Sequence, residues 1–434
     1  MKKTAALVIC SLLLIGCSRP VWAAEIAEPG KPLEGTLTIS TFYAEQQTKS
    51  MIDLFRAENP GVEVVVNAVF DRYPASTEDY REGMNIFATQ LASGETADLY
   101  DTTYLSAAKF VNSGYFEDLY DYMEADESFH KEDYFEKVFE ACESNGALYQ
   151  IPQAFYFSMI RLNKNITEQL DYEIPDTMDY RDVYQLFSMA REKGFVNSEF
   201  TIDRNDMSLG YLQMAEDRLY VRPDLKEVSF DSQEFVECLR MLSEMSQYKP
   251  QIPQNDMSDI RDFSGTDCLM NAFPSWIDNS PQNLFDETET GSAPVLLTAS
   301  DGKVPFYRLG AYWSIGAGAK EKALAWEFIK FCIGQRDFEF SDVSSPDYDR
   351  NFFSYAAMIN RNNTMQLAEH YLGENEAAVQ KWNEYNNCVN AKFFTEMQLG
   401  SMMSEYYQQC FDGTVTPEEC AEVLQQRVSI YMNE

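Results

Sequence analysis

The chain has 434 residues, of which 45% are hydrophobic and 24% are charged. This length and apolar content are enough for two or three domains with buried cores, and they exclude a disordered chain. The chain has 34 Lys and Arg residues and 70 Asp and Glu residues, and the resulting net charge of −36 argues against nucleic acid as a partner. With only His130 and His370, a His-rich metal site and a Ser-His-Asp triad are not expected.

The first residues have the features of a secretory signal. Lys2 and Lys3 precede an apolar run at 7–16, which is shorter than the roughly 20 residues that a membrane-spanning helix needs. The run ends in the letters LIGC, which resemble the lipobox of bacterial lipoproteins. That resemblance implies cleavage before Cys17 and a diacylglyceryl anchor on its sulfur.

The resulting organisation is a signal peptide at 1–16 and a lipid-anchored tether at 17–34. We therefore expect the protein on the outer face of the cytoplasmic membrane, held there by its anchor. The alternative is ordinary signal cleavage after Ala23 or Ala24, where small residues also permit it.

Cysteine usage does not indicate a disulfide framework. Of nine cysteines, Cys10 lies in the signal and Cys17 is the anchor candidate, which leaves seven. An odd number without a CxxC pair argues against a complete set of disulfides and against a zinc knuckle. Cys410 and Cys420 could bridge a short loop, and the sequence leaves that open.

Hydrophobic patterning predicts alternating strands and helices. Strands are expected at 36–42, 62–69, 97–100, 155–162 and 312–315, and helices at 46–58, 77–93, 104–112, 179–193, 232–247 and 321–333, followed by a last helix after Thr416. The β-branched run at 62–69 is typical of a strand buried on both faces. The strand–helix–strand order at the start indicates an α/β lobe.

Two helices carry a recognisable start. Asp231 and Glu234 have the spacing of a capping box at the helix over 232–247. Thr416 and Glu419 have the same spacing around Pro417 at the last helix.

Several segments in order resemble the extracellular solute-binding proteins of ABC importers, in particular the carbohydrate-binding family that includes maltose-binding proteins. They are LTISTFY with FRAENPGVEV, ATQLASGETADLYDTTYLSAAKFVNSGYFEDL, GALYQIPQAFYFSMIRLNK, SAPVLLTASDGK with LGAYWSIGAGAKEKALAWEFIKF, and the tail EYYQQCFDGTVTPEECAEVLQQRV. The stretch 195–290 matches poorly.

The resemblance implies an α/β, two-lobed periplasmic-binding-protein-like fold of type II, with the lobes joined by crossing hinge strands. Lobe 1 is expected at 35–147 plus 295–338, and lobe 2 at 148–294 plus 339–434. A ligand would lie between the lobes, where loops beyond the carboxyl ends of the strands face the crevice.

Sugar recognition needs flat aromatic faces and planar polar groups. The sequence offers such side chains just after strands or in loops, and we predict these as ligand-binding residues: Tyr43, Glu45, Asp101, Tyr104, Phe155, Tyr156, Trp276 and Trp313. The alternative for each aromatic is a place in the core, and Asp101 can also cap the helix that follows it.

The predicted function is capture of a carbohydrate, favouring an oligosaccharide, and its delivery to an ABC permease. We expect a monomer with no catalytic residues, no metal and no cofactor. Alternatives are a surface sensor or adhesion lipoprotein with the same fold, or a secreted glycan hydrolase, for which no catalytic motif was found. The sequence leaves open whether the ligand is a sugar, a polyamine, a peptide or an amino acid. Arg308 could pair with a carboxylate on the ligand.

Overall fold

The computed structural model describes residues 24–433 apart from a set of internal segments. These segments are 44–46, 72–76, 94–96, 104, 106–109, 111–112, 196–200, 204–207, 223–225, 249–267, 275–290, 337–356, 374 and 394–396. All structural statements below concern the described residues.

Strands and helices alternate along most of the chain. The strands are β1 (Gly35–Tyr43), β2 (Val62–Phe70), β3 (Leu99–Asp101), β4 (Ile151–Asn163), β5 (Thr177–Met178), β6 (Thr201–Asp203), β7 (Val221–Arg222), β8 (Glu227–Val228), β9 (Cys268–Pro274), β10 (Ser292–Leu297), β11 (Val304–Ile315), β12 (Ala357–Met358) and β13 (Val389–Lys392). The helices are α1 (Gln47–Glu58), α2 (Thr77–Ser93), α4 (Leu119–Ala125), α5 (Glu136–Cys142), α6 (Lys164–Gln169), α7 (Tyr180–Glu192), α8 (Ser208–Tyr220), α9 (Gln233–Ser246), α12 (Lys322–Ile333), α13 (Arg361–Leu372), α14 (Glu376–Cys388), α15 (Met397–Phe411) and α16 (Pro417–Asn433), with a short 3-10 turn at Lys131–Asp133.

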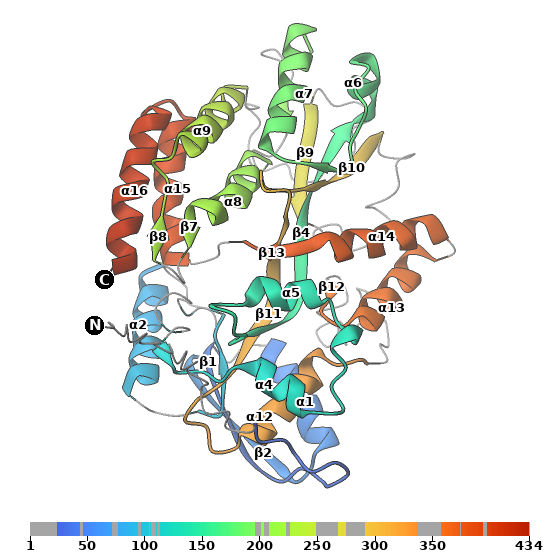
Figure 1. Cartoon of the computed structure of the whole chain (residues 1–434), viewed down its shortest axis with the longest axis vertical. Helices are drawn as coiled ribbons and strands as arrows, with labels where there is room; N and C mark the ends of the chain where they lie inside the picture. The colour runs from blue at the N-terminus through green and yellow to red at the C-terminus, as the bar shows by residue number, and fades with distance from the viewer. Residues whose placement is uncertain are drawn as a thin grey trace, which may run out of the picture.

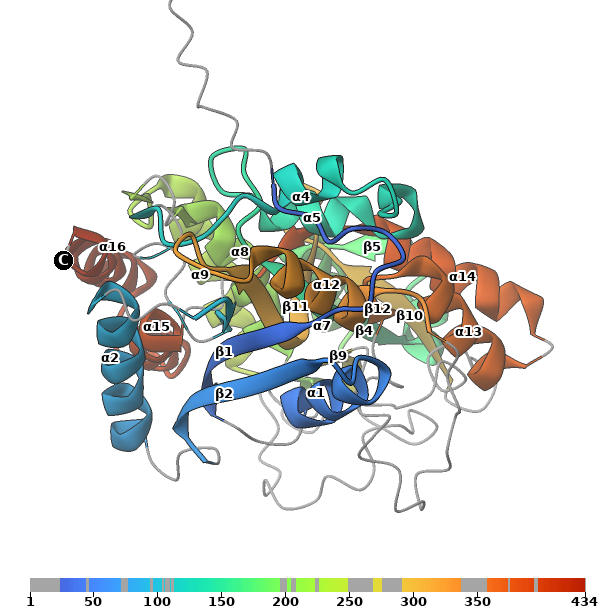
Figure 2. The same ribbon diagram turned by 90° about the horizontal axis from the view of Figure 1, so that it is seen from below.

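One mixed sheet organises the molecule. Its main order is β2-β1-β3-β11-β4-β10-β5, with β1 parallel to β2 and β3, and β4 antiparallel to β10 and β11. In Figure 1, β4 and β11 run along the long axis, with α1, α4 and α12 around the lower part and α6 to α9, α15 and α16 around the upper part. Figure 2 shows β1 and β2 side by side at the lower end, next to α1 and α12.

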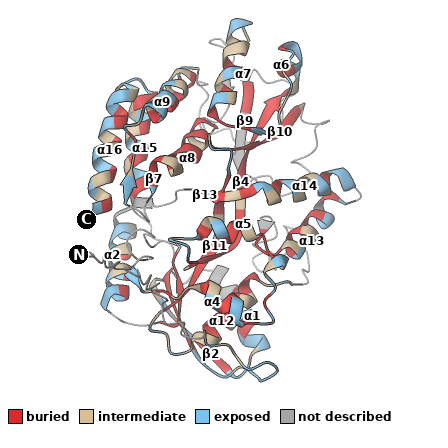
Figure 3. Ribbon diagram, in the orientation of Figure 1, coloured by how far each residue is buried: buried red, intermediate tan, exposed pale blue. Residues whose placement is uncertain are grey.

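Two large hydrophobic cores lie along this sheet. The first contains residues of β1, β2, α1 and α12 and is joined by Met358, Trp382 and Val389 from the C-terminal part of the chain. The second is built by α7, α8, α9, α15 and α16. Strand β4 is buried along most of its length (Figure 3) and contributes Met159 to the first core and Ile160 to the second. It therefore links two separately packed parts, and the predicted lobe boundaries stay a prediction.

Most predicted elements are present, and the predicted strands are longer than expected except β3, which is shorter. The last helix begins as predicted, because Thr416 Oγ1 accepts a hydrogen bond from Glu419 N at 3.2 Å and Glu419 Oε2 accepts one from Thr416 N at 2.9 Å. The cap of α9 was predicted wrongly. Ser232, one residue after Asp231, caps this helix by accepting from Phe235 N at 3.3 Å.

The prediction for β2 was also wrong in one respect. The strand exists, but among the described strands it pairs only with β1, and its residues Glu63, Val65 and Asn67 are exposed. A β-branched run reports a preference for extended backbone, whereas burial on both faces depends on the position of the strand in the sheet. The helix predicted at 104–112 lies largely outside the described residues.

Candidate ligand-binding site at the central strands

A polar junction lies where β3 ends between β1 and β11. Asp101, the last residue of β3, is buried, and its carboxylate accepts hydrogen bonds from Thr41 Oγ1 at 3.3 Å and from Thr103 N at 3.1 Å. Burial raises the pKa of the Asp101 carboxyl, while hydrogen bonds from Thr103 and Thr41 and the charge of Arg308 act in the opposite direction. The carboxylate thus braces β1 and the turn after β3. A cap on the helix predicted at 104–112 stays a prediction.

Thr102 ties three strands together next to Asp101. Its hydroxyl lies 3.1 Å from the carbonyl oxygen of Tyr312, 3.1 Å from Ser314 Oγ and 3.4 Å from Gln150 Oε1. Gln153 adds a further bond, because its Oε1 accepts from Ala311 N at 3.1 Å. These contacts fix the geometry at which β3, β4 and β11 meet.

Beyond this junction, aromatic rings stack across β4, β11 and α8. Tyr156 of β4 is half-buried and stacks on Tyr307 of β11, with ring centroids 5.0 Å apart and planes 19° apart. Tyr307 in turn stacks on Phe393 at 3.9 Å and meets the edge of Tyr211 from α8 at 6.3 Å. We call Tyr156, Tyr307, Phe393 and Tyr211 the aromatic stack. Its two partly exposed members, Tyr156 and Tyr211, offer ring surface at the edge of the second core.

The hydroxyl groups of Tyr211 and Tyr307 stay protonated at neutral pH. Burial raises the pKa of Tyr211 and Tyr307 above the ordinary tyrosine value, and the neighbouring Tyr156 adds to both shifts. The hydroxyl of Tyr307 is directed at Met214 Sδ, 3.4 Å away. Neutral phenols can donate a hydrogen bond as well as accept one, which suits sugar hydroxyls.

Two of the predicted site residues are core residues. Phe155 is fully buried between Phe135 and Phe306, with edge-on contacts at 5.5 Å and 5.7 Å. Trp313 is fully buried against Phe328 at 5.4 Å. Neither side chain has exposed surface in this structure, which agrees with the core alternative, and ligand contact by these two residues stays a prediction. Strand alternation explains the difference from Tyr156, because Phe155 and Tyr156 point to opposite faces of β4.

The remaining predicted residues are described incompletely. Tyr43 ends β1 opposite Phe70, which places its backbone at the carboxyl edge of the sheet. Its side chain and all of Glu45, Tyr104, Trp276 and the anchor candidate Cys17 lie outside what the structure describes. Their roles stay predictions.

The sequence analysis did not single out Tyr211 and Tyr307. Tyr211 lies in the poorly matching stretch and on a helix, where an aromatic residue normally indicates packing. Tyr307 had a usable signal, since it lies directly opposite Tyr156 in the pairing of β11 with β4. That pairing could not be seen, because the predicted strand began only at 312.

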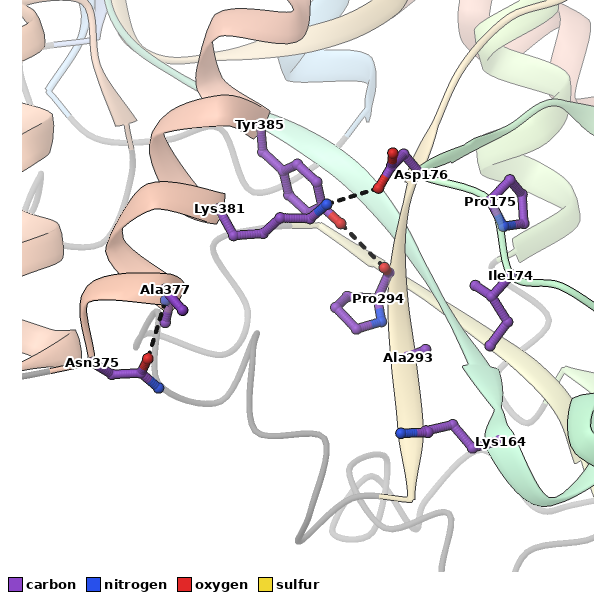
Figure 4. Close-up of a pocket in the computed structure, with 11 residues that line it drawn as sticks. Lys164, Ile174, Pro175, Asp176, Ala293, Pro294, Asn375, Ala377, Lys381 and Tyr385 are labelled. Carbon is purple, nitrogen blue, oxygen red and sulfur yellow. Dashed lines mark hydrogen bonds and ion pairs between the residues drawn. The ribbon is translucent and has the colours of Figure 1, made fainter.

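A cavity of about 490 Å³ lies between α14 and β10 (Figure 4). Lys381 of α14 pairs with Asp176 at 2.8 Å across it, and the Tyr385 hydroxyl donates to the carbonyl oxygen of Pro294 at 3.2 Å. Its wall is otherwise mostly aliphatic, with Ile174 and Pro175 opposite α14. Among the described residues, no predicted site residue lines this cavity. In Figure 1, α14 lies on the other side of β4 from α8.

Part of the chain is similar to a known protein family. The family model described as bacterial extracellular solute-binding protein matches residues 36–193. No significant match was found among curated protein sequences.

Solved structures of solute-binding proteins have the same fold. The sugar-binding protein MalE from Xanthomonas citri matches with a TM-score of 0.62 and 16% identity over 92% of this chain and 98% of the other. A family 1 solute-binding protein from Alicyclobacillus acidocaldarius has a TM-score of 0.58 and 14% identity over 93% and 100% of the two chains. The substrate-binding protein Lmo0181 from Listeria monocytogenes has a TM-score of 0.55 and 16% identity over 92% of this chain and 100% of the other.

The structural matches confirm the predicted fold class. The family that matches residues 36–193 is described as extracellular. Among the described residues, no helix has both the length and the apolar character needed to cross a bilayer.

Proposed function

We propose that this solute-binding protein captures a carbohydrate, an oligosaccharide rather than a monosaccharide, and delivers it to an ABC permease. It does so as a lipid-anchored monomer on the outer face of the cytoplasmic membrane. The ligand is held between two lobes, which correspond in this proposal to 35–147 plus 295–338 and to 148–294 plus 339–434.

The observation that carries the proposal is the aromatic stack. A pyranose ring has an apolar C–H face that packs on flat aromatic rings, and hydroxyls at its edge that need hydrogen-bond partners. Tyr156 and Tyr211 supply two partly exposed rings on different elements, β4 and α8, which suits a ligand of more than one sugar unit. Proteins of similar structure were solved with cycloalternan, maltose and D-mannitol.

Substitution of the exposed rings tests the proposal. In a thermal-shift screen against mono- and oligosaccharides, with polyamines and dipeptides as controls, we expect an oligosaccharide at 100 times its Kd to add about 2.7 kcal/mol of stability. Tyr156→Ala and Tyr211→Ala should each weaken that sugar by about 10-fold or more, as loss of a stacking contact costs about 1–2 kcal/mol.

Tyr431→Ala serves as the matched control, because Tyr431 is a partly exposed tyrosine on α16. It should bind the sugar with unchanged affinity. A response to a polyamine or dipeptide instead of any sugar would overturn the substrate class. Wild-type affinity in both stack variants would place the sugar elsewhere, and the cavity beside α14 is then the next location to probe.

The lipid anchor is tested separately in cells. Wild-type protein should incorporate an alkyne-labelled fatty acid and sediment with membranes, because Cys17 directly follows the small residue at the end of the apolar run. Cys17→Ser should abolish labelling and release the protein. Cys10→Ala is the control, since Cys10 lies in the segment that is removed. Continued labelling of Cys17→Ser would favour cleavage after Ala23 or Ala24.

A further inference from the structure

Two cysteines meet in the helical hairpin at the C-terminal end of the chain. Cys410 lies in the last turn of α15 and Cys420 in the first turns of α16, and the two helices pack on each other, joined by residues 412–416. Both side chains are buried, with 0% and 1% exposure. Both cysteines are free thiols in this structure.

The position of the Cys420 sulfur places it beside Cys410. Cys420 Sγ donates to the carbonyl oxygen of Tyr406 at 3.5 Å. In an α-helix this carbonyl also accepts the N–H group four residues later, which is that of Cys410. The sulfur of Cys420 therefore lies against the helical turn that carries Cys410.

Other cysteines in the described part of the chain have different neighbours. Cys142 faces the hydroxyl of Tyr312, and Cys332 faces Gln153 and Trp313. Cys388 is exposed on α14. The hairpin pair differs from these three in that the sulfur of Cys420 lies against the helical turn that carries Cys410.

We propose that Cys410 and Cys420 form a reversible disulfide that ties α15 to α16 once the protein is outside the cytoplasm. Disulfides persist in extracytoplasmic compartments, and the family that matches residues 36–193 is described as extracellular. The bond would fasten a hairpin that α9 already holds, since Ser243 Oγ donates to the carbonyl oxygen of Cys410 at 3.2 Å and Ser246 Oγ to that of Phe411 at 2.8 Å. The disulfide would restrict the unfolded chain and would therefore stabilise the native hairpin relative to it.

The oxidant is an external disulfide, such as oxidised glutathione. The thiolate of Cys410 attacks one sulfur of that disulfide and displaces the other as a thiolate, and the thiolate of Cys420 then displaces the remaining half. Two electrons pass to the oxidant, the S–S bond forms between the protein sulfurs, and the two protons leave with the released thiols. The neighbouring Cys420 thiol lowers the pKa of Cys410, which favours Cys410 as the attacking sulfur.

The test uses residues 18–434, which hold seven cysteines in the reduced state. The protein is equilibrated with oxidised glutathione both when folded and during refolding from urea, so that burial cannot hide the reaction. Thiols are then alkylated and the chain is cleaved with trypsin. Residues 393–427 contain both cysteines and no internal Lys or Arg, so they leave as one peptide. We expect this peptide to be two hydrogens lighter than its reduced form, to carry no alkyl group, and to regain both thiols with a reductant.

Variants separate the pair from the other cysteines. Cys410→Ser and Cys420→Ser should each lack the lighter peptide, whereas Cys388→Ser should still form it. The oxidised wild type should melt several degrees above its reduced form, and the double variant should melt at one temperature with or without reductant. Full alkylation of both cysteines after refolding in oxidant, or a cross-link to another cysteine, would overturn the proposal.

Discussion

Replacing Trp313 with Ala is expected to lower the free energy of unfolding by about 3–5 kcal/mol while the folded protein still binds its sugar. Trp313 lies on β11 between Asp101 of β3 and Ile151 of β4, and its ring is perpendicular to Phe328 of α12. Removing a fully buried indole from this position leaves a cavity that the surrounding sheet cannot close. Urea titration measures the loss, and titration of the same variant with sugar measures affinity.

This experiment distinguishes a core role from a ligand-binding role. Tyr156→Ala is the counterpart, since Tyr156 is partly exposed and should lose sugar affinity with a smaller loss of stability. If Trp313→Ala stayed near wild-type stability and lost the ligand, the sequence prediction would be correct and the buried placement of Trp313 would be wrong.

Local signals in the sequence were sufficient for most elements of the fold. Helix α16 was predicted from Thr416, Pro417 and Glu419, and those residues form the expected cap. Such caps act over three or four residues, so they can be read without knowledge of the tertiary fold. The prediction that β2 is buried on both faces was wrong, because the edge position of this strand follows from the pairing order of the whole sheet.

The candidate site was less predictable because it depends on which face a side chain takes. The length of β11 is the clearest case. A bulge between Leu309 and Tyr312, with Gly310 at a φ of 75°, interrupts the alternation, so the pattern indicated only the last residues of the strand. Once the strand is extended back to 304, Tyr307 falls opposite Tyr156, and the aromatic stack follows from the pairing.

A buried acid in the second core gives the protein an expected dependence of stability on pH. Asp217 of α8 accepts hydrogen bonds from the Tyr407 hydroxyl at 2.5 Å and from Gln213 Nε2. Burial raises the pKa of its carboxyl to about 8, the neighbouring Glu216 adds to the rise, and the bonds from Tyr407 and Gln213 oppose it. Glu216 itself is held by the backbone and hydroxyl of Ser300, at 2.6 Å and 2.7 Å.

Wild-type protein is expected to lose stability between pH 5 and pH 8, and Asp217→Asn should remove much of that loss. The folded pKa exceeds the ordinary value of 3.8, so between these values the folded protein binds a proton that the unfolded chain releases. Stability then falls by up to about 1.4 kcal/mol per pH unit as pH rises, and the loss ends once the folded state also ionises. Urea titrations at each pH should show a wild-type loss on the order of 2–4 kcal/mol larger than that of the variant.

Asp126→Asn is the matched control, because it is the same substitution at a carboxylate with the opposite shift. Burial raises the pKa of Asp126, but bonds from Lys330, Ser128 and Trp326 outweigh that effect and hold it at about 2. Its stabilising contribution is therefore present above pH 4 and disappears only as the pH falls through about 2, so this variant should lose stability throughout pH 5 to 8 without a change in slope. Equal slopes in wild type and Asp217→Asn would show that Asp217 is already ionised in the fold. In that case Tyr407 and Gln213 compensate its charge more fully than its burial implies.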